Sequence, residues 1–220
     1  MTSERLAAKL RGFGPVGVAA ALVVLAFGPI LEPFNSLPAL VWIHLSRTPW
    51  REVGLARPKS WVATIAAGVL GGTALKLFSK SVLMPLVGAP AVNPDYHYLF
   101  GNAAALPEMM VDVILGAGFG EELVFRGFLF ERLGKLLGAS AAAKTAIVLA
   151  TGILFGAVHY PLGGIFSATQ ATFVGLVYGA VFAKTGRLWP LIAAHAAFNV
   201  VAVLIIYLGW EEAFAHLIFR

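Results

Sequence analysis

Long apolar runs dominate the sequence, and they restrict the chain to folds that a lipid bilayer can surround. A helix needs about 20 predominantly apolar residues to cross the hydrocarbon core. Seven candidate runs cover residues 13–31, 34–45, 61–80, 106–137, 140–159, 162–183 and 188–209. Run 34–45 is too short to cross unaided and suits a re-entrant segment, whereas 106–137 is long enough to bend or to form two helices. The runs predict an all-α, polytopic transmembrane helix bundle of roughly seven or eight helices.

The composition supports this class. Apolar residues make up 59% of the 220 positions and charged residues only 12%, whereas soluble domains are about one quarter charged. The length allows a single membrane domain, 1–220, in which we expect the tail 210–220 to form an interfacial helix. The chain has no cysteine, which excludes disulfides, thiolate nucleophiles and Cys-based metal sites.

The basic residues predict an orientation, because cytoplasmic loops carry an excess of Lys and Arg. With a cytoplasmic N-terminus and every run spanning, twelve of the 16 Lys and Arg residues lie inside, and loop 82–105 on the other side has none. The net charge of +5 is therefore assigned to cytoplasmic loops and not to nucleic-acid binding. Lys76 and Lys80 are exceptions that we expect to snorkel to the headgroups. Three basic residues before run 13–31 indicate an uncleaved signal anchor, and the composition indicates a bacterial inner (plasma) membrane.

Ionisable residues within the runs are candidates for function, because a charge at the bilayer centre costs about 2.5–3.5 kcal/mol. The first cluster is Glu121-Glu122-Leu-Val-Phe-Arg126. Glu122 and Arg126 are four residues apart and in the favourable order for an ion pair on one helix face. This pair suits a brace between packed helices. Glu121 points about 100° away and has no local partner, so we expect it to act with a group from another helix.

Two further clusters contain histidine. His159 ends the segment Phe-Gly-Ala-Val-His beside Tyr160-Pro161, where a single histidine is more often structural. His195 and Asn199 share a helix face and are flanked by alanines, which allow close approach of a helix or a substrate. They can join helices by hydrogen bonds, but two polar groups one turn apart are more typical of a site that faces a cavity.

Together these groups suit the hydrolysis of a peptide bond. Glu121 can activate a water whose protons it shares with His159, and His195 and Asn199 can donate hydrogen bonds to the oxyanion of an attacked carbonyl. One difficulty concerns depth, because His159 falls near the outer end of run 140–159 while Glu121 lies deeper. The helix must therefore tilt, begin inside the protein, or continue past Pro161 into a broken segment.

The three motifs, Glu-Glu-x-x-x-Arg, Phe-x-x-x-His and His-x-x-x-Asn, occur in this order within apolar runs, and they resemble the CPBP family. This family comprises the CAAX proteases and the bacteriocin-processing (Abi) proteins, and it includes the eukaryotic Ras-converting CAAX endopeptidase. Gly54-Leu55 and Pro58 also resemble a Gly-Leu-x-x-Pro loop of bacterial members. The resemblance extends over about residues 54–204.

The resemblance implies an intramembrane glutamic endopeptidase with a protease-like core at 61–209, preceded by N-terminal helices and a cytoplasmic loop at 13–60. It assigns water activation to Glu121 and His159, and the oxyanion site to His195 and Asn199. The implied site has no metal and no cofactor, and the implied partner is a membrane-associated peptide or protein. Two alternatives are a zinc protease with Glu121, His159 and His195 as ligands and a non-catalytic, peptide-binding immunity protein. The sequence specifies neither the substrate nor the oligomeric state.

Overall fold

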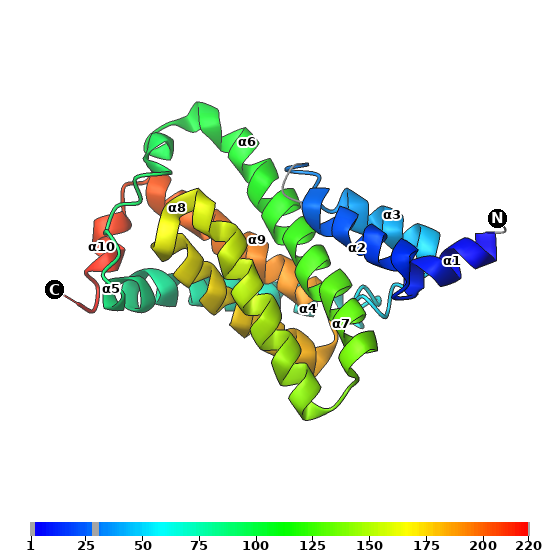
Figure 1. The fold of residues 1–220 in the computed structure, drawn as a ribbon. Helices are drawn as coiled ribbons and strands as arrows, with labels where there is room; N and C mark the ends of the chain where they lie inside the picture. Colours follow the sequence, from blue (N-terminus) through cyan, green and yellow to red (C-terminus); the bar gives the residue numbers. More distant parts are fainter. Residues whose placement is uncertain (1–2, 28–30, 220) are drawn as a thin grey trace.

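A computed structural model describes residues 3–27 and 31–219, and every regular element in these ranges is helical (Figure 1). The α-helices are α1 (Ser3–Arg11), α2 (Pro15–Phe27), α3 (Leu37–Ser46), α4 (Trp61–Phe78), α5 (Met84–Leu86), α6 (Leu106–Val111), α7 (Phe130–Leu137), α8 (Ala141–Thr185), α9 (Trp189–Tyr207) and α10 (Glu211–Ala215). Wider π turns form η1 (Ser79–Leu83), η4 (Asp112–Glu121) and η5 (Leu123–Leu129), and 3-10 turns form η2 (His97–Leu99) and η3 (Ala103–Ala105).

Within the described ranges, four helical stretches are long and apolar enough to cross a membrane. They are Trp61–Leu86, Ala103–Leu137, Ala141–Thr185 and Trp189–Tyr207. α1 and α2 are a fifth candidate if this pair, bent by 69°, is one span. The prediction of an all-α membrane bundle is therefore confirmed. Run 34–45 becomes the ten-residue α3, which is too short to cross about 30 Å of hydrocarbon.

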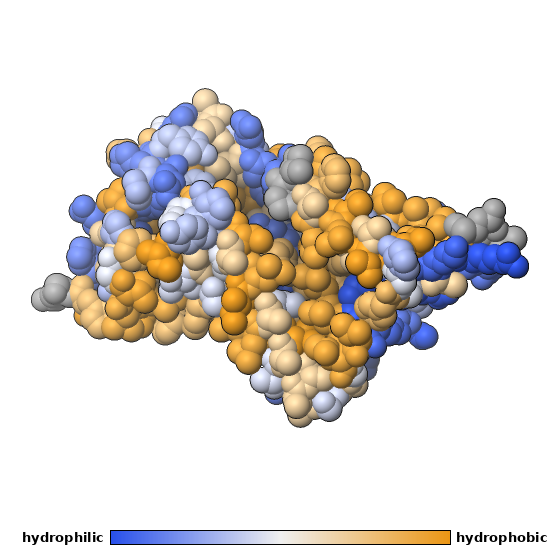
Figure 2. Space-filling view, viewed as in Figure 1, coloured by the Kyte–Doolittle hydropathy of each residue, from blue (hydrophilic) through white to orange (hydrophobic). Residues whose placement is uncertain are grey.

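The surface is consistent with a lipid environment. Apolar residues cover most of the face in Figure 2, and polar residues gather near α1 and, at the opposite end, around the loop before α6. Val62 and Leu70 of α4 are 81% and 71% exposed. Soluble proteins rarely expose apolar patches of such extent. The chain is an integral membrane protein.

Runs 140–159 and 162–183 form the two arms of a hairpin within α8. The helix breaks at Gly163 and Gly164, where Gly164 adopts a φ of 61° that favours glycine. Figure 1 shows α8 turning back on itself. Gly152 lies against Leu176 and Gly156 lies against Thr172, so the arms are antiparallel. The first arm thus continues past Pro161, which is one of the solutions to the depth difficulty that the sequence allowed.

Run 106–137 is one continuous helix, Ala103–Leu137, and not two. Its central part is built from the wide turns of η4 and η5. Three of its glycines allow close approach of other segments. Gly118 lies against Ala196 of α9, and Gly116 and Gly120 lie against the loop that precedes α3.

α4 and α9 pack through small residues, as is common between membrane helices. A Cβ at Gly72 would lie 1.9 Å from the carbonyl oxygen of Ala194, whereas a Cβ at Gly71 would meet nothing within 4 Å. We therefore expect Gly72→Ala to destabilise the protein by about 1–3 kcal/mol through overpacking. Gly71→Ala is the matched control and is expected to be neutral or slightly stabilising, because alanine favours helix. Thermal unfolding in detergent measures both variants, and equal midpoints would contradict this account of the packing.

Candidate active site

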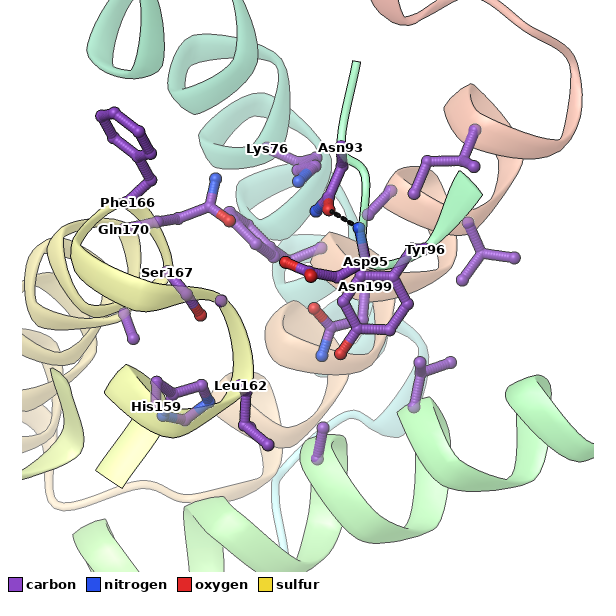
Figure 3. Close-up of a pocket in the computed structure, with 18 of the residues that line it drawn as sticks. Lys76, Asn93, Asp95, Tyr96, His159, Leu162, Phe166, Ser167, Gln170 and Asn199 are labelled. Atoms are coloured by element: carbon purple, nitrogen blue, oxygen red, sulfur yellow. Dashed lines mark hydrogen bonds between the residues drawn. The ribbon is translucent and has the colours of Figure 1, made fainter. Parts of the chain in front are cut away.

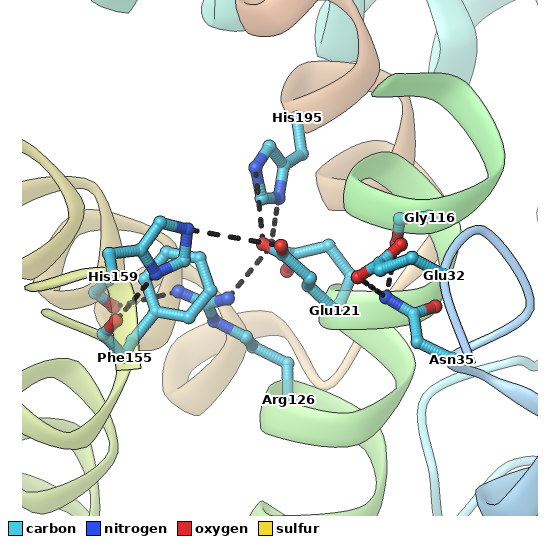
Figure 4. Close-up of polar contacts among 10 residues, drawn as sticks. Glu32, Asn35, Gly116, Glu121, Arg126, Phe155, His159 and His195 are labelled. Carbon is cyan, nitrogen blue, oxygen red and sulfur yellow. Dashed lines mark hydrogen bonds and ion pairs between the residues drawn. The ribbon is translucent and has the colours of Figure 1, made fainter. Parts of the chain in front are cut away.

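Glu121 and two histidines from separate helices meet at the centre of the bundle (Figure 4). One Glu121 carboxylate oxygen lies 3.9 Å from Nε2 of His159, and the other lies 3.8 Å from Nε2 of His195. These separations are too long for direct hydrogen bonds, but a water between the groups can bond to both. The structure thus brings together the carboxylate and the imidazoles that the sequence placed in three different runs.

Glu121 and His159 reach the same depth because the long helix and the first arm of α8 share the short loop 138–140. Glu121 lies 16 residues before the end of α7, and His159 lies 18 residues after the start of α8. At 1.5 Å per residue, both are roughly 25 Å from this loop. His159 lies one turn before the break at Gly163, so the break follows the site and does not separate it from Glu121.

A hydrogen bond orients the His159 ring. Its Nδ1 lies 2.7 Å from the carbonyl oxygen of Phe155, and because a carbonyl only accepts, Nδ1 carries a proton. In a neutral ring, Nε2 then has a free lone pair that faces Glu121. His159 can therefore accept a proton from a water near that carboxylate.

Glu122 forms the centre of a sealed ionic network. Its side chain is fully buried, and its Oε1 accepts hydrogen bonds from Nη1 of Arg126 and Nδ1 of His195, both at 2.8 Å. Arg126 also donates to the carbonyl of Gly175 at 3.2 Å. The ion pair between Glu122 and Arg126 is as expected. It extends further than one helix, because it joins the long helix to α9 and to the second arm of α8.

This network decides what His195 can donate. Because its Nδ1–H is used by Glu122, only Nε2 faces Glu121 and the cavity. His195 can therefore donate to an oxyanion only when Nε2 carries a proton as well, that is, as the doubly protonated imidazolium. Above Arg126, the rings of Phe155 and Tyr178 lie 4.7 and 5.8 Å from the guanidinium carbon. Tyr178 belongs to an apolar run, and no pattern in the sequence distinguished it.

Glu121, both histidines and Asn199 line one cavity of about 590 Å³. Asn199 faces it one turn after His195 on α9, together with Phe166 and Leu162 of α8 (Figure 3). Within the described ranges, its amide forms no hydrogen bond to protein. It is therefore free to bond to a molecule in the cavity. In the same ranges, no three His, Asp or Glu side chains are grouped as a metal site requires.

The loop before α3 contributes residues that the sequence analysis missed. The Asn35 amide donates to Glu32 at 2.7 Å and to the carbonyl of Gly116 at 3.1 Å. Glu32 also lines the cavity. Their role depends on contacts made 81 residues apart in the chain, for which the sequence holds no local pattern.

Glu32 is expected to make stability depend on pH. Desolvation against the long helix, and then repulsion from Glu121, raise the pKa of Glu32 from 4.5 to about 7. Protonated Glu32 therefore stabilises the fold. This stabilisation is fully present below pH 4.5 and is lost as the pH rises through about 7, the pKa in the folded protein. The Glu32→Gln side chain can still accept the hydrogen bond from the Asn35 amide, but it has no ionisable group. Between about pH 5 and pH 8, we expect the variant to gain on the order of 2 °C in melting temperature relative to wild type. Parallel pH curves for the two proteins would contradict this.

Lys76 and Lys80 differ from the expectation that both snorkel to the headgroups. Lys80 donates to the carbonyl of Ala91 at 2.5 Å and forms an ion pair with Glu211 at 3.3 Å. Lys76 is 9% exposed and lines the cavity. The snorkelling prediction is wrong because Lys76 of α4 faces α9, whereas Lys80 of η1 is held by the loop after α5 and by α10.

Comparison with known families covers the part of the chain that carries this site. Residues 103–201 match the family model described as Rce1-like, type II CAAX prenyl endopeptidase. All the side chains predicted for the site, from Glu121 to Asn199, lie within the matched segment. No curated protein and no solved structure matches the chain. Residues 103–201, a little under half of the chain, are thus similar to the Rce1-like family of type II CAAX prenyl endopeptidases.

Proposed function

We propose that this protein is an intramembrane endopeptidase that hydrolyses a peptide bond through a water activated by Glu121 and His159. The observation that carries the proposal is the 3.9 Å separation between the Glu121 carboxylate and Nε2 of His159, which one water on the cavity side can bridge by hydrogen bonds to both groups. The cavity beside it supports the same conclusion, because about 590 Å³ is in the range of pockets that bind small ligands.

The reaction follows from the placement of the four groups. The water loses a proton to the Glu121 carboxylate as its oxygen attacks the carbonyl carbon, and the C=O electron pair moves onto the carbonyl oxygen. His195, held by Glu122, and Asn199 donate hydrogen bonds to this oxyanion. When the oxyanion collapses, the C–N bond breaks, and the proton passes from Glu121 by way of His159 to the leaving amine. The first products are a carboxylic acid, which keeps the second water proton, and an amine; transfer of that proton then gives a carboxylate and an ammonium group.

The substrate class that the family name suggests is a prenylated peptide ending in Cys-a-a-X. The test uses purified protein in nanodiscs and a farnesylated, internally quenched peptide with this ending, beside the same peptide without the farnesyl group. We expect cleavage of the farnesylated peptide, and we expect it to persist after treatment with 1,10-phenanthroline. Loss of cleavage with the chelator and recovery with added zinc would instead support the metalloprotease alternative.

A further inference from the structure

Lys76 is a buried cation whose charge the protein itself does not neutralise. It lies on α4 with 9% of its surface exposed, and its Nζ is 4.9 Å from the centre of the Phe198 ring. Within residues 3–27 and 31–219, the Lys76 ammonium has no hydrogen bond and no carboxylate within 4.0 Å. Buried charges in proteins are normally paired, and inside a membrane an ionisable residue that faces a cavity marks a substrate or ion pathway by default.

Three polar side chains near Lys76 already have hydrogen-bond or ion-pair partners of their own. Lys80, one turn further along the helix, is neutralised by Glu211 at 3.3 Å. The same Glu211 oxygen accepts the backbone N–H of Asn93 at 2.9 Å. On the other side, the Gln170 amide donates to Ser79 at 2.6 Å. These three neighbouring side chains are therefore satisfied by contacts of their own, and the Lys76 ammonium is left facing the cavity.

The position of Lys76 relates it to the proposed reaction. It lines the same cavity as Glu121, His159 and Asn199 (Figure 3). Phe198, which its ammonium contacts, directly precedes Asn199 on α9. An anion bound to Lys76 would therefore lie in the same cavity as the predicted oxyanion site and not in a separate pocket.

We propose that Lys76 binds a carboxylate of the substrate and thereby selects which peptide bond reaches Glu121. The inference rests on the proposed endopeptidase function and names a determinant of its specificity. Carboxylate is the anion that a peptide supplies, either at its C-terminus or on an Asp or Glu side chain. Lys76 lies outside the family match at 103–201, so the match does not account for this residue.

Binding to a catalytically inert protein separates this inference from the proposed function. The background is Glu121→Gln, and the probes are three fluorescent farnesylated peptides that differ only at the C-terminus. The first ends in a free carboxylate, the second in an amide, and the third in an amide after a terminal Asp. We expect the first to bind at least about tenfold tighter than the second. If the third binds like the first, a side-chain carboxylate suffices. If it binds like the second, the site requires the C-terminal carboxylate.

Variants at one position complete the test. Adding Lys76→Met, which keeps the length and apolar stem of the side chain, is expected to abolish the preference for the free carboxylate. The affinity for the amide peptide should not change. Lys76→Arg is expected to retain the preference, and its thermal unfolding serves as the check on folding. Equal binding of the carboxylate and amide peptides to the protein that retains Lys76 would overturn the inference. An equal loss of affinity for both peptides in Lys76→Met would also overturn it. Neither result depends on whether wild type cleaves the peptides.

Discussion

Replacing Glu121 with glutamine is expected to lower peptide cleavage by about 10²- to 10⁴-fold, the usual contribution of a general base. The amide has the shape of the carboxylate but cannot accept the proton of the attacking water. Gaps of 3.9 and 3.8 Å to His159 and His195 leave room for the amide without contact. The fold should therefore survive, and initial rates with the quenched peptide measure the effect.

Glu108→Gln is the matched control for this variant. Glu108 lies on the same long helix but is exposed, and we expect wild-type rates from it. Cleavage by Glu121→Gln at the wild-type rate would refute the assigned mechanism. If wild type itself binds peptides without cleaving them, the non-catalytic, peptide-binding alternative is the better description of the protein.

Replacing Arg126 with methionine is expected to produce the largest loss of stability. Arg126 is 1% exposed and Glu122 is fully buried, so the substitution leaves a buried carboxylate without its cation. Breaking a buried ion pair in this way costs about 3–5 kcal/mol. The free energy of unfolding in mixed micelles measures the loss, and a wild-type value would show that the pair is not stabilising.

The double variant Glu122→Gln and Arg126→Met separates the two contributions. It removes both charges, so no charge is left unpaired in the interior, and we expect a smaller loss than for Arg126→Met alone. Activity should nevertheless stay low in the double variant. The amide introduced at position 122 accepts the His195 Nδ1–H less strongly than a carboxylate does, so the ring is held less firmly in the orientation that aims Nε2 at the oxyanion.

The sequence was informative where a contact is local. The spacing of Glu122 and Arg126 on one helix predicted their ion pair, and apolar length predicted the bundle. The glycine pair after Pro161 marked the break in α8. Each of these depends on residues within one continuous stretch of the chain, which a local pattern can reveal.

The sequence was uninformative where a contact joins distant segments. Helical periodicity could not show that His195 bonds to Glu122, which is 73 residues away. For the same reason, Lys76 was assigned to the lipid face, because no local feature indicates which side of α4 packs against α9. Glu32 and Asn35 were missed because a short loop between apolar runs has no periodicity from which its docking site can be predicted.

The glycine contacts of the long helix have a consequence for its rotational setting. Successive residues of a helix point about 100° apart, so a turn of the helix by one residue would bring the sealed Glu122 to the cavity and bury Glu121. A Cβ at position 118 would lie 2.9 Å from Cβ of Ala196, and a Cβ at position 120 would lie 1.5 Å from Oδ1 of Asn35. Any larger side chain rotated to these two positions would collide with its neighbour. The loop before α3 and the small residues of α9 thus fix the rotation of the long helix. In this rotation Glu121 faces the cavity and Glu122 stays in the ion network.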